Sequence, residues 1–277
     1  MFSNLEKSNY INKAITKIIK EDGTKITQQE EILQETAIFY ETLYKSSSHE
    51  LEHGDEFNDF VKNIDIPTLS NSESMSIEGK INREEASIVL KNMTNNKSPG
   101  SSGFSAEFYK CFWKQLGDFV CRALNHAFIS GNLSITQTQG IITCIPKGDK
   151  PKQYLKNWRP ITLLNTIYKI GSGCIANRLK IHLDKLINND QTGFIKGRFI
   201  GENIRLIYDL MQYTEENNIP GLLLLIDFEK AFDSLSWTFV NKTLSLFNFG
   251  KYIKRWFNIT EFQLYAKTDF YQSTCIS

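Results

Sequence analysis

Apolar residues recur at helix and strand spacing along most of the chain. Near the N-terminus, Asp22 and Gly23 lie between two short isoleucine-containing segments, a pattern typical of a tight β-hairpin. Thr27 and Glu30 then match a capping box ahead of apolar residues at helical spacing, which predicts an amphipathic helix up to Tyr44. Residues 46–79 are mostly polar and predict a linker or surface loop.

Further helices are predicted before residue 218. Asn82 and Glu85 form a second capping box, followed by a short helix and a turn at residues 95–100. Ser105 predicts a helix start, and another helix runs from about Asp118 to a stop at Gly131. Residues 165–186 and 199–217 also have helical periodicity.

Three apolar runs have the length and boundaries of strands. Residues 140–146 and 161–164 are joined by a loop rich in Lys, Pro and Gly, which predicts a β-hairpin with a basic tip. Residues 221–228 form a nearly continuous apolar run after a Pro-Gly pair, which predicts a strand covered on both faces. The mixture of helices and strands predicts an α+β fold.

Composition predicts a folded protein outside the secretory pathway. Of the 277 residues, 41% are hydrophobic and 23% are charged, which excludes general disorder. The longest apolar run, at 221–228, is far shorter than the roughly 20 residues that span a membrane. Because the N-terminus has no signal-peptide pattern, we expect the nucleus or cytoplasm. Five scattered cysteines without a C-x-x-C pair predict reduced thiols.

The net charge of +1 hides a basic block. Residues 140–205 contain twelve lysines and arginines against four acidic residues. Such a block suits a polyanion, either nucleic acid or a triphosphate. A solvated surface with scattered lysines agrees with the composition equally well.

Asp227 is the strongest candidate for chemistry. A rigid strand would hold its carboxylate well enough to bind a metal ion, and the residues after it turn into a helix whose first amides can face a phosphate. This combination predicts phosphoryl or nucleotidyl transfer, while the alternative is that Asp227 or Asp233 caps the helix. Lys147 and Arg159, on adjacent strands, could reach the same polyphosphate.

One local match to a zinc motif is rejected. Residues 49–53 read H-E-L-E-H, the H-E-x-x-H spacing, but they lie in a polar segment without an apolar helix face to orient the ligands.

The order of several motifs resembles the reverse transcriptases of LINE-type non-LTR retrotransposons. The resemblance rests on KSPGSSGFSAEFY, GIITCIPK, NWRPITLLN, YKI, ANRLK, DQTGFIKGR and IDFEKAFDSLSW. It implies an incomplete right-hand polymerase fold of class α+β, with helical fingers, a β-hairpin, and the first palm strand and helix. The implied division is residues 1–80 (N-terminal hairpin, helix and linker), 81–218 (fingers) and 219–277 (start of the palm).

The resemblance also implies roles for individual residues. Asp227 and the backbone carbonyl of Phe228 would bind Mg²⁺. The triphosphate of an incoming dNTP would contact Lys147, Arg159, Lys230 and Ala231, with Phe232 beneath its sugar. The loop expected along RNA template or DNA primer contains Gln191, Gly193, Phe194, Lys196 and Arg198. The family uses two Mg²⁺ ions for nucleotidyl transfer.

Two departures from the family pattern matter. Ser102 replaces the acidic residue of K-S-P-G-x-D-G, which affects a turn or a fingers contact. The 277 residues contain no Asp-Asp pair, so the (Y/F)-x-D-D motif is absent and we expect this polypeptide alone to be inactive. The alternatives are a non-enzymatic nucleic-acid-binding remnant of a retroelement and a pseudogene product that does not fold. The resemblance also implies a ribonucleoprotein that visits the nucleus.

Overall fold

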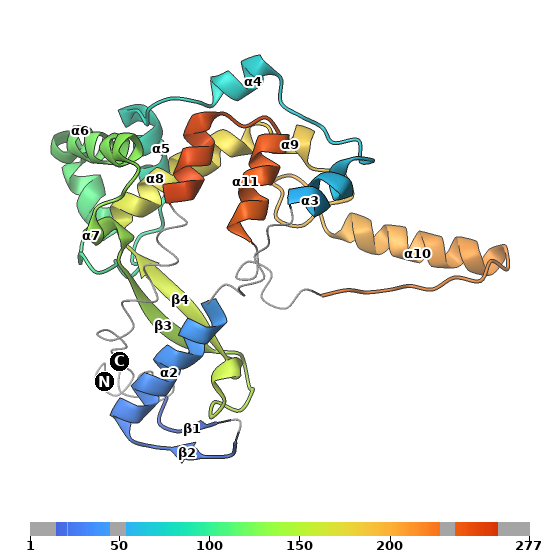
Figure 1. The fold of residues 1–277 in the computed structure, drawn as a ribbon, viewed down its shortest axis with the longest axis horizontal. Coiled ribbons are helices and arrows are strands. Elements are labelled where there is room, and N and C mark those ends of the chain that lie inside the picture. The colour runs from blue at the N-terminus through green and yellow to red at the C-terminus, as the bar shows by residue number, and fades with distance from the viewer. Residues whose placement is uncertain (1–14, 21, 45–53, 228–235, 260–277) are drawn as a thin grey trace. The chain divides into compact units, whose positions relative to one another are not determined.

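The computed structural model describes residues 15–20, 22–44, 54–227 and 236–259 (Figure 1). The chain divides into two compact units, each built from segments far apart in sequence. The first unit contains residues 1–49, 79–175 and 255–277, and the second contains residues 50–78 and 176–254. Within the described ranges, helices are combined with two separate two-stranded sheets, so the expected mixture of helix and sheet is confirmed.

The predicted N-terminal hairpin and helix are both present in the first unit. Strands β1 (Ile18–Ile19) and β2 (Lys25–Ile26) pair antiparallel, with Ile18 opposite Ile26. In the turn between them, the Asp22 carboxylate accepts a 2.8 Å hydrogen bond from the Thr24 amide. Helix α2 (Gln29–Tyr44) follows directly.

Helices α5 (Arg83–Asn92) and α6 (Ala106–Ser130) pack together in the first unit. The predicted capping box of α5 is confirmed, because Asn82 and Glu85 each bind the other's backbone amide. The region predicted as two helices is the long α6, whose two helical parts meet at a kink at Phe112, earlier than the predicted boundary near Asp118. Gly131 ends α6 in the left-handed conformation, at φ 80°, as its sequence position predicted.

The basic hairpin is present as predicted. Strands β3 (Gly140–Pro146) and β4 (Trp158–Leu164) pair antiparallel over their full lengths, with Gly140 opposite Leu164 and Pro146 opposite Trp158. The short helix α7 (Ile135–Thr138) precedes β3, and the 3-10 turn η1 (Leu155–Asn157) leads into β4.

The long helix predicted for residues 165–186 is interrupted. Helix α8 (Thr166–Lys180) is followed by the short α9 (Leu183–Leu186). At the end of α8, the amides of Ile181 and His182 donate to carbonyls three residues earlier, at 3.3 and 3.1 Å. This tighter spacing closes the last turn and ends the helix.

The prediction of a linker over residues 46–79 was partly wrong. The second unit contains helices α3 (Gly54–Val61) and α4 (Asn71–Ser76) within this range. A capping box at the start of α4 joins the Ser70 hydroxyl to the Glu73 amide and the Glu73 carboxylate to the Ser70 amide. Polar composition had hidden this local signal, because capping residues are themselves polar.

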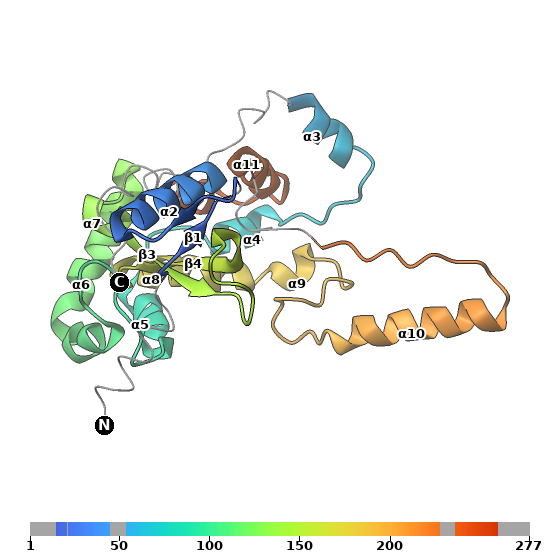
Figure 2. The ribbon, with the colours of Figure 1, turned by 90° about the horizontal axis from the view of Figure 1, so that it is seen from below.

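The helix predicted at 199–217 is confirmed as α10 (Gly201–Glu216). The strand predicted at 221–228 was wrong over residues 221–227, the part that the structure describes. After α10 the chain reverses and runs back in extended form (Figures 1 and 2). Residues 221–227 belong to no described sheet, and Leu222 is 92% exposed. A strand exists only when another strand satisfies its backbone groups, and none of the described strands pairs with this segment.

Two helical segments follow the residues that the structure leaves undescribed after Asp227. Helix α11 (Trp237–Leu246) begins with the Ser236 hydroxyl accepting from the Phe239 amide, and residues 251–259 are also helical. None of the helices in the described ranges has the length and hydropathy needed to cross a membrane. Among the described cysteines, Cys121 and Cys174 are buried and Cys111 is exposed.

Candidate functional site

The β3–β4 hairpin brings Lys147 and Arg159 to the same end of one sheet. Arg159 lies opposite Ile145 in the register, and Lys147 directly follows the last residue of β3. The Arg159 side chain is exposed, whereas Lys147 is half-buried. The two cations expected to share a polyphosphate are therefore carried by neighbouring strand ends, as the sequence predicted.

The loop at this end is fastened by its own side chains. The indole nitrogen of Trp158, a residue only 2% exposed, donates to the carbonyl of Lys152 at 2.7 Å. The Asn157 side-chain amide donates to the carbonyl of Pro151 at 2.8 Å. Lys147 donates twice, from its backbone to the carbonyl of Asn157 (2.8 Å) and from Nζ to that of Lys156 (2.7 Å). These bonds give a basic loop with defined geometry.

Asp227 lies at the end of the extended segment after α10, and its side chain is exposed. Asp227 belongs to the second unit, while Lys147 and Arg159 belong to the first, so their expected proximity stays a prediction. The other residues assigned to the metal and nucleotide by resemblance, Phe228, Lys230, Ala231 and Phe232, lie outside the described residues.

The loop expected along template or primer is organised around Arg198. Its guanidinium donates to the carbonyls of Ile187 (3.0 Å), Asn188 (2.5 Å) and Gln191 (2.9 Å), and its side chain is only 13% exposed. It also lies 3.6 Å from the Asp184 carboxylate. Arg198 therefore acts within the protein as the support of residues 187–198.

The same loop presents two residues outward. Phe194 is 95% exposed and has a positive φ of 64°, which is uncommon for a bulky side chain. Lys196 is also exposed, while Gln191 donates to the carbonyl of Gly193 at 3.2 Å. The outward aromatic ring and cation have the chemistry that a nucleic-acid strand contacts.

Sequence reasoning missed the role of Asn165. Its buried side chain accepts a hydrogen bond from the Ser102 amide at 2.9 Å and donates to the carbonyl of Thr136. A Cβ at Gly100 would lie 2.5 Å from the backbone nitrogen of Asn165, so only glycine fits there. The departure at Ser102 therefore falls in a turn that packs against Asn165. The glycine of K-S-P-G and the asparagine just before α8 were the features of the sequence that could have indicated this contact.

No group of three or more Asp, Glu, His or Cys side chains suited to a metal ion occurs among the described residues. The H-E-x-x-H match at 49–53 lies outside them. The Asp227 carboxylate is exposed, and its role as a metal ligand stays a prediction.

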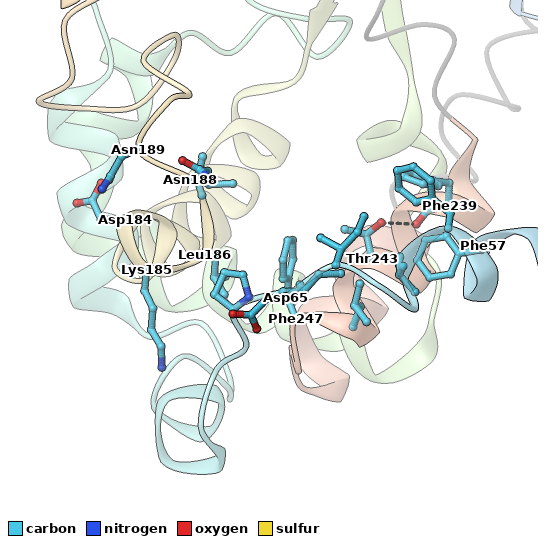
Figure 3. A pocket seen from close by; sticks show the side chains of 17 residues that line it. Phe57, Asp65, Asp184, Lys185, Leu186, Asn188, Asn189, Phe239, Thr243 and Phe247 are labelled. Carbon is cyan, nitrogen blue, oxygen red and sulfur yellow. Dashed lines mark hydrogen bonds between the residues drawn. The ribbon is translucent and has the colours of Figure 1, made fainter.

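The second unit also contains a mostly apolar pocket of about 550 Å³, and none of the residues predicted by sequence lines it. Phe57 of α3 and Phe239 of α11 meet edge to face on its wall, with ring centroids 5.5 Å apart (Figure 3). Asp65, Asp184 and Asn188 also line it. The cavity holds none of the candidate catalytic residues.

Comparison with known proteins agrees with the motifs. Residues 145–277 match the family "Reverse transcriptase (RNA-dependent DNA polymerase)". The chain is 33% identical over 276 residues to the Transposon TX1 uncharacterized 149 kDa protein of Xenopus laevis, covering 99% of this chain and 20% of that protein. It is 23% identical over 156 residues to the Retrovirus-related Pol polyprotein from type-1 retrotransposable element R1 of Bradysia coprophila, covering 56% of this chain and 15% of that protein.

The chain thus spans about a fifth of the first relative's length and less of the second. The matched region begins just before Lys147 and includes Arg159, the loop at 187–198 and Asp227. Both relatives carry transposable-element names, which agrees with the resemblance that the motifs indicated. These findings support the assignment of this chain to the reverse transcriptases of LINE-type, non-LTR retrotransposons.

Proposed function

We propose that this chain forms the fingers and the start of the palm of an RNA-directed DNA polymerase encoded by a LINE-type retroelement. Its substrates are an RNA template, a DNA primer and dNTPs. The observation that carries the proposal is the single family match that contains Lys147, Arg159 and Asp227. Localisation to a ribonucleoprotein in the nucleus or cytoplasm follows from the same proposal.

The basic hairpin is proposed to bind the dNTP triphosphate. Arg159 has an exposed guanidinium that can bind two phosphate oxygens at once, and Lys147 acts as a point charge. One proton of the Lys147 ammonium is donated to the carbonyl of Lys156, which leaves two for phosphate oxygens. Lys230 and Ala231 would add backbone amides, and Phe232 would lie beneath the sugar.

For the metal, one carboxylate is too few. Mg²⁺ requires near-octahedral oxygen ligands and loses its water reluctantly. Asp227 offers one carboxylate, the carbonyl of Phe228 is proposed as a further ligand, and the 277 residues contain no Asp-Asp pair. These residues do not fit a site for two ions by themselves. We therefore assign no catalytic step to the polypeptide alone and expect it to be inactive.

The loop at 187–198 is proposed to lie along template or primer. Phe194 and Lys196 are its exposed residues. Just before them, the hydrogen bond from the Gln191 side chain to the Gly193 carbonyl shapes the turn. Arg198 supports the loop from within through its three carbonyl contacts. Its contribution to nucleic-acid binding is therefore indirect.

Nucleotide binding tests the proposed pocket. Titration of a fluorescent dNTP in Mg²⁺ should show about tenfold weaker binding for Lys147→Met and for Arg159→Met, because each removes a charged hydrogen bond to phosphate. Lys114→Met changes an exposed lysine of α6 in the same unit and serves as the matched control. Unchanged affinity in both hairpin variants would overturn the assignment.

Primer extension tests inactivity of the polypeptide. Purified protein with an RNA template, a DNA primer and dNTPs should incorporate no nucleotide. Incorporation that is lost in Asp227→Ala would show that this chain completes a catalytic site, and the proposal of inactivity would be abandoned.

A second function, binding nucleic acid without catalysis, is favoured by the basic block and by the outward position of Lys196. It predicts salt-dependent RNA binding that weakens in Lys196→Gln and is unaffected by Asp227→Asn. The polymerase proposal also places Lys196 on nucleic acid, so the dNTP titration separates the two functions.

A further inference from the structure

We infer that the N-terminal hairpin and α2, which precede the matched family region, hold the basic loop in place, and that Leu155 is a positioning residue for Lys147. The inference rests on the proposed role of Lys147 in triphosphate binding. It extends that function to residues 15–44, which lie outside the family match. Three sets of contacts support it, all within the first unit.

The first contact is a shared hydrophobic cluster. Leu155, in the 3-10 turn before β4, is 6% exposed and packs with Ile18 of β1, Ile26 of β2 and Ile32 of α2. Ile18 and Ile32 are each 2% exposed. The rest of the loop between β3 and β4 consists mainly of Lys, Pro, Gly and polar residues. Leu155 is therefore the main apolar anchor of this loop, and N-terminal elements bury it.

The second contact is a backbone hydrogen bond between the two segments. The Ile19 amide donates to the carbonyl of Gln153 at 2.8 Å, on the edge of β1 that is not paired with β2. The loop thus occupies the second edge of β1. A backbone hydrogen bond forms only over a narrow range of distances, so this one fixes the separation between the N-terminal hairpin and the loop.

The third contact transmits this position to Lys147. Leu155, Lys156 and Asn157 form one turn of 3-10 helix. The carbonyl of Asn157 accepts from the Lys147 amide at 2.8 Å, and the carbonyl of Lys156 accepts from its Nζ at 2.7 Å. Both acceptors follow Leu155 directly in sequence. A shift of Leu155 therefore moves the backbone and the ammonium of Lys147 together.

A lysine side chain has several rotatable bonds and loses conformational freedom when it binds a phosphate. The bond from Nζ to Lys156 already restricts the Lys147 side chain before nucleotide arrives. Preorganisation of this kind raises affinity without any new contact to the ligand. The N-terminal elements should therefore affect nucleotide affinity although they supply no ligand to it.

The experiment measures affinity for a fluorescent dNTP in Mg²⁺ with the full 277-residue chain. Leu155→Ala should weaken binding by about fivefold to tenfold, close to the effect of Lys147→Met. Leu155→Met, which keeps the volume, should bind like the unmodified chain. Leu133→Ala, a comparable deletion in the separate Ala127, Leu133 and Ile259 cluster of the same unit, serves as the control and should leave affinity unchanged.

A double variant separates positioning from general loosening. In the Lys147→Met background, Leu155→Ala should cause little further loss, because the group that it positions is gone. Hydrogen exchange should show faster exchange of the Lys147 and Ile19 amides in Leu155→Ala. If Leu155→Ala does not fold, Ile32→Val provides a milder change in the same cluster and should give a smaller loss in the same direction.

The outcomes are distinct. If Lys147→Met binds as tightly as the unmodified chain, the proposed function of the hairpin fails. If Lys147→Met weakens binding but the Leu155→Ala and Ile32→Val variants that fold do not, the pocket stands and the inference about the N-terminal elements is wrong. Equal losses from Leu155→Ala and Leu133→Ala would also overturn it.

Discussion

The carboxylate of Glu78 accepts a 2.8 Å hydrogen bond from the backbone amide of Tyr252, although 174 positions separate the two residues. Its other oxygen accepts from the amide of Ile253 at 3.1 Å. Residues 251–259 are helical, so Glu78, from a distant part of the chain, accepts hydrogen bonds from amides at a helix start. Gly250 makes this possible, since a Cβ there would lie 2.4 Å from the Glu78 carboxyl carbon.

Glu78→Ala should lower the free energy of unfolding by about 1–2 kcal/mol, because two helix-start amides lose their acceptor. Urea denaturation measures this change. Glu215→Ala, near the C-terminal end of α10 in the same unit, is the control and should change stability by less than about 0.5 kcal/mol. Equal effects of the two substitutions would contradict a capping role for Glu78.

Stability should depend on pH through Glu73. A hydrogen bond from Lys185, with further bonds from Ser70, lowers the pKa of Glu73 from 4.5 to about 2. A carboxyl with a depressed folded-state pKa stabilises the protein above its unfolded pKa, and this contribution is lost as pH falls through the window from about 4.5 to 2. Glu73→Gln should therefore be less stable than the unmodified chain at about pH 6.

The difference between Glu73→Gln and the unmodified chain should shrink as pH is lowered from about 6 to about 3, when measured by urea denaturation. Lys185→Gln should reduce the same pH dependence, because it removes the hydrogen-bond donor that lowers the pKa of Glu73 most. A stability difference that stays constant across this range would show that the Glu73 charge has no role.

Gly171→Ala should destabilise the first unit. A Cβ at this position of α8 would lie 2.8 Å from Leu124 and 2.8 Å from Trp256, both of which are buried. Overpacking of this kind costs about 1–3 kcal/mol, more than the roughly 1 kcal/mol by which alanine favours a helix. Thermal unfolding checks the change. Gly221→Ala, where no atom lies within 4 Å of the added Cβ, should be neutral.

Arg198→Lys should loosen the loop at 187–198. A lysine cannot span the carbonyls of Ile187, Asn188 and Gln191 as the planar guanidinium does. Loss of these charged hydrogen bonds should lower the local opening energy by about 2 kcal/mol. Hydrogen exchange or limited proteolysis of this loop measures the effect. Lys196→Gln, two residues away and exposed, should leave loop protection unchanged while weakening RNA binding.

Local signals in the sequence determined much of the secondary structure. Asp22-Gly23 placed the N-terminal hairpin, the Asn82 and Glu85 pair placed α5, and Gly131 ended α6. The order of the motifs along the chain also indicated the family, which the family match confirms. These predictions succeeded because each depends on contacts between residues close in sequence, or on a pattern that is read directly from the residues.

Tertiary structure alone decided which distant residues meet. It placed Leu155 among three N-terminal isoleucines, Arg198 beneath its loop, and Asn165 against Ser102. It also left residues 221–227 exposed and unpaired with any described strand, although their apolar run predicted a buried one. The physical reason is that burial and strand pairing require partners from elsewhere in the chain. Hydrophobic periodicity shows which residues of a segment favour burial, but it does not show which other residues will cover them.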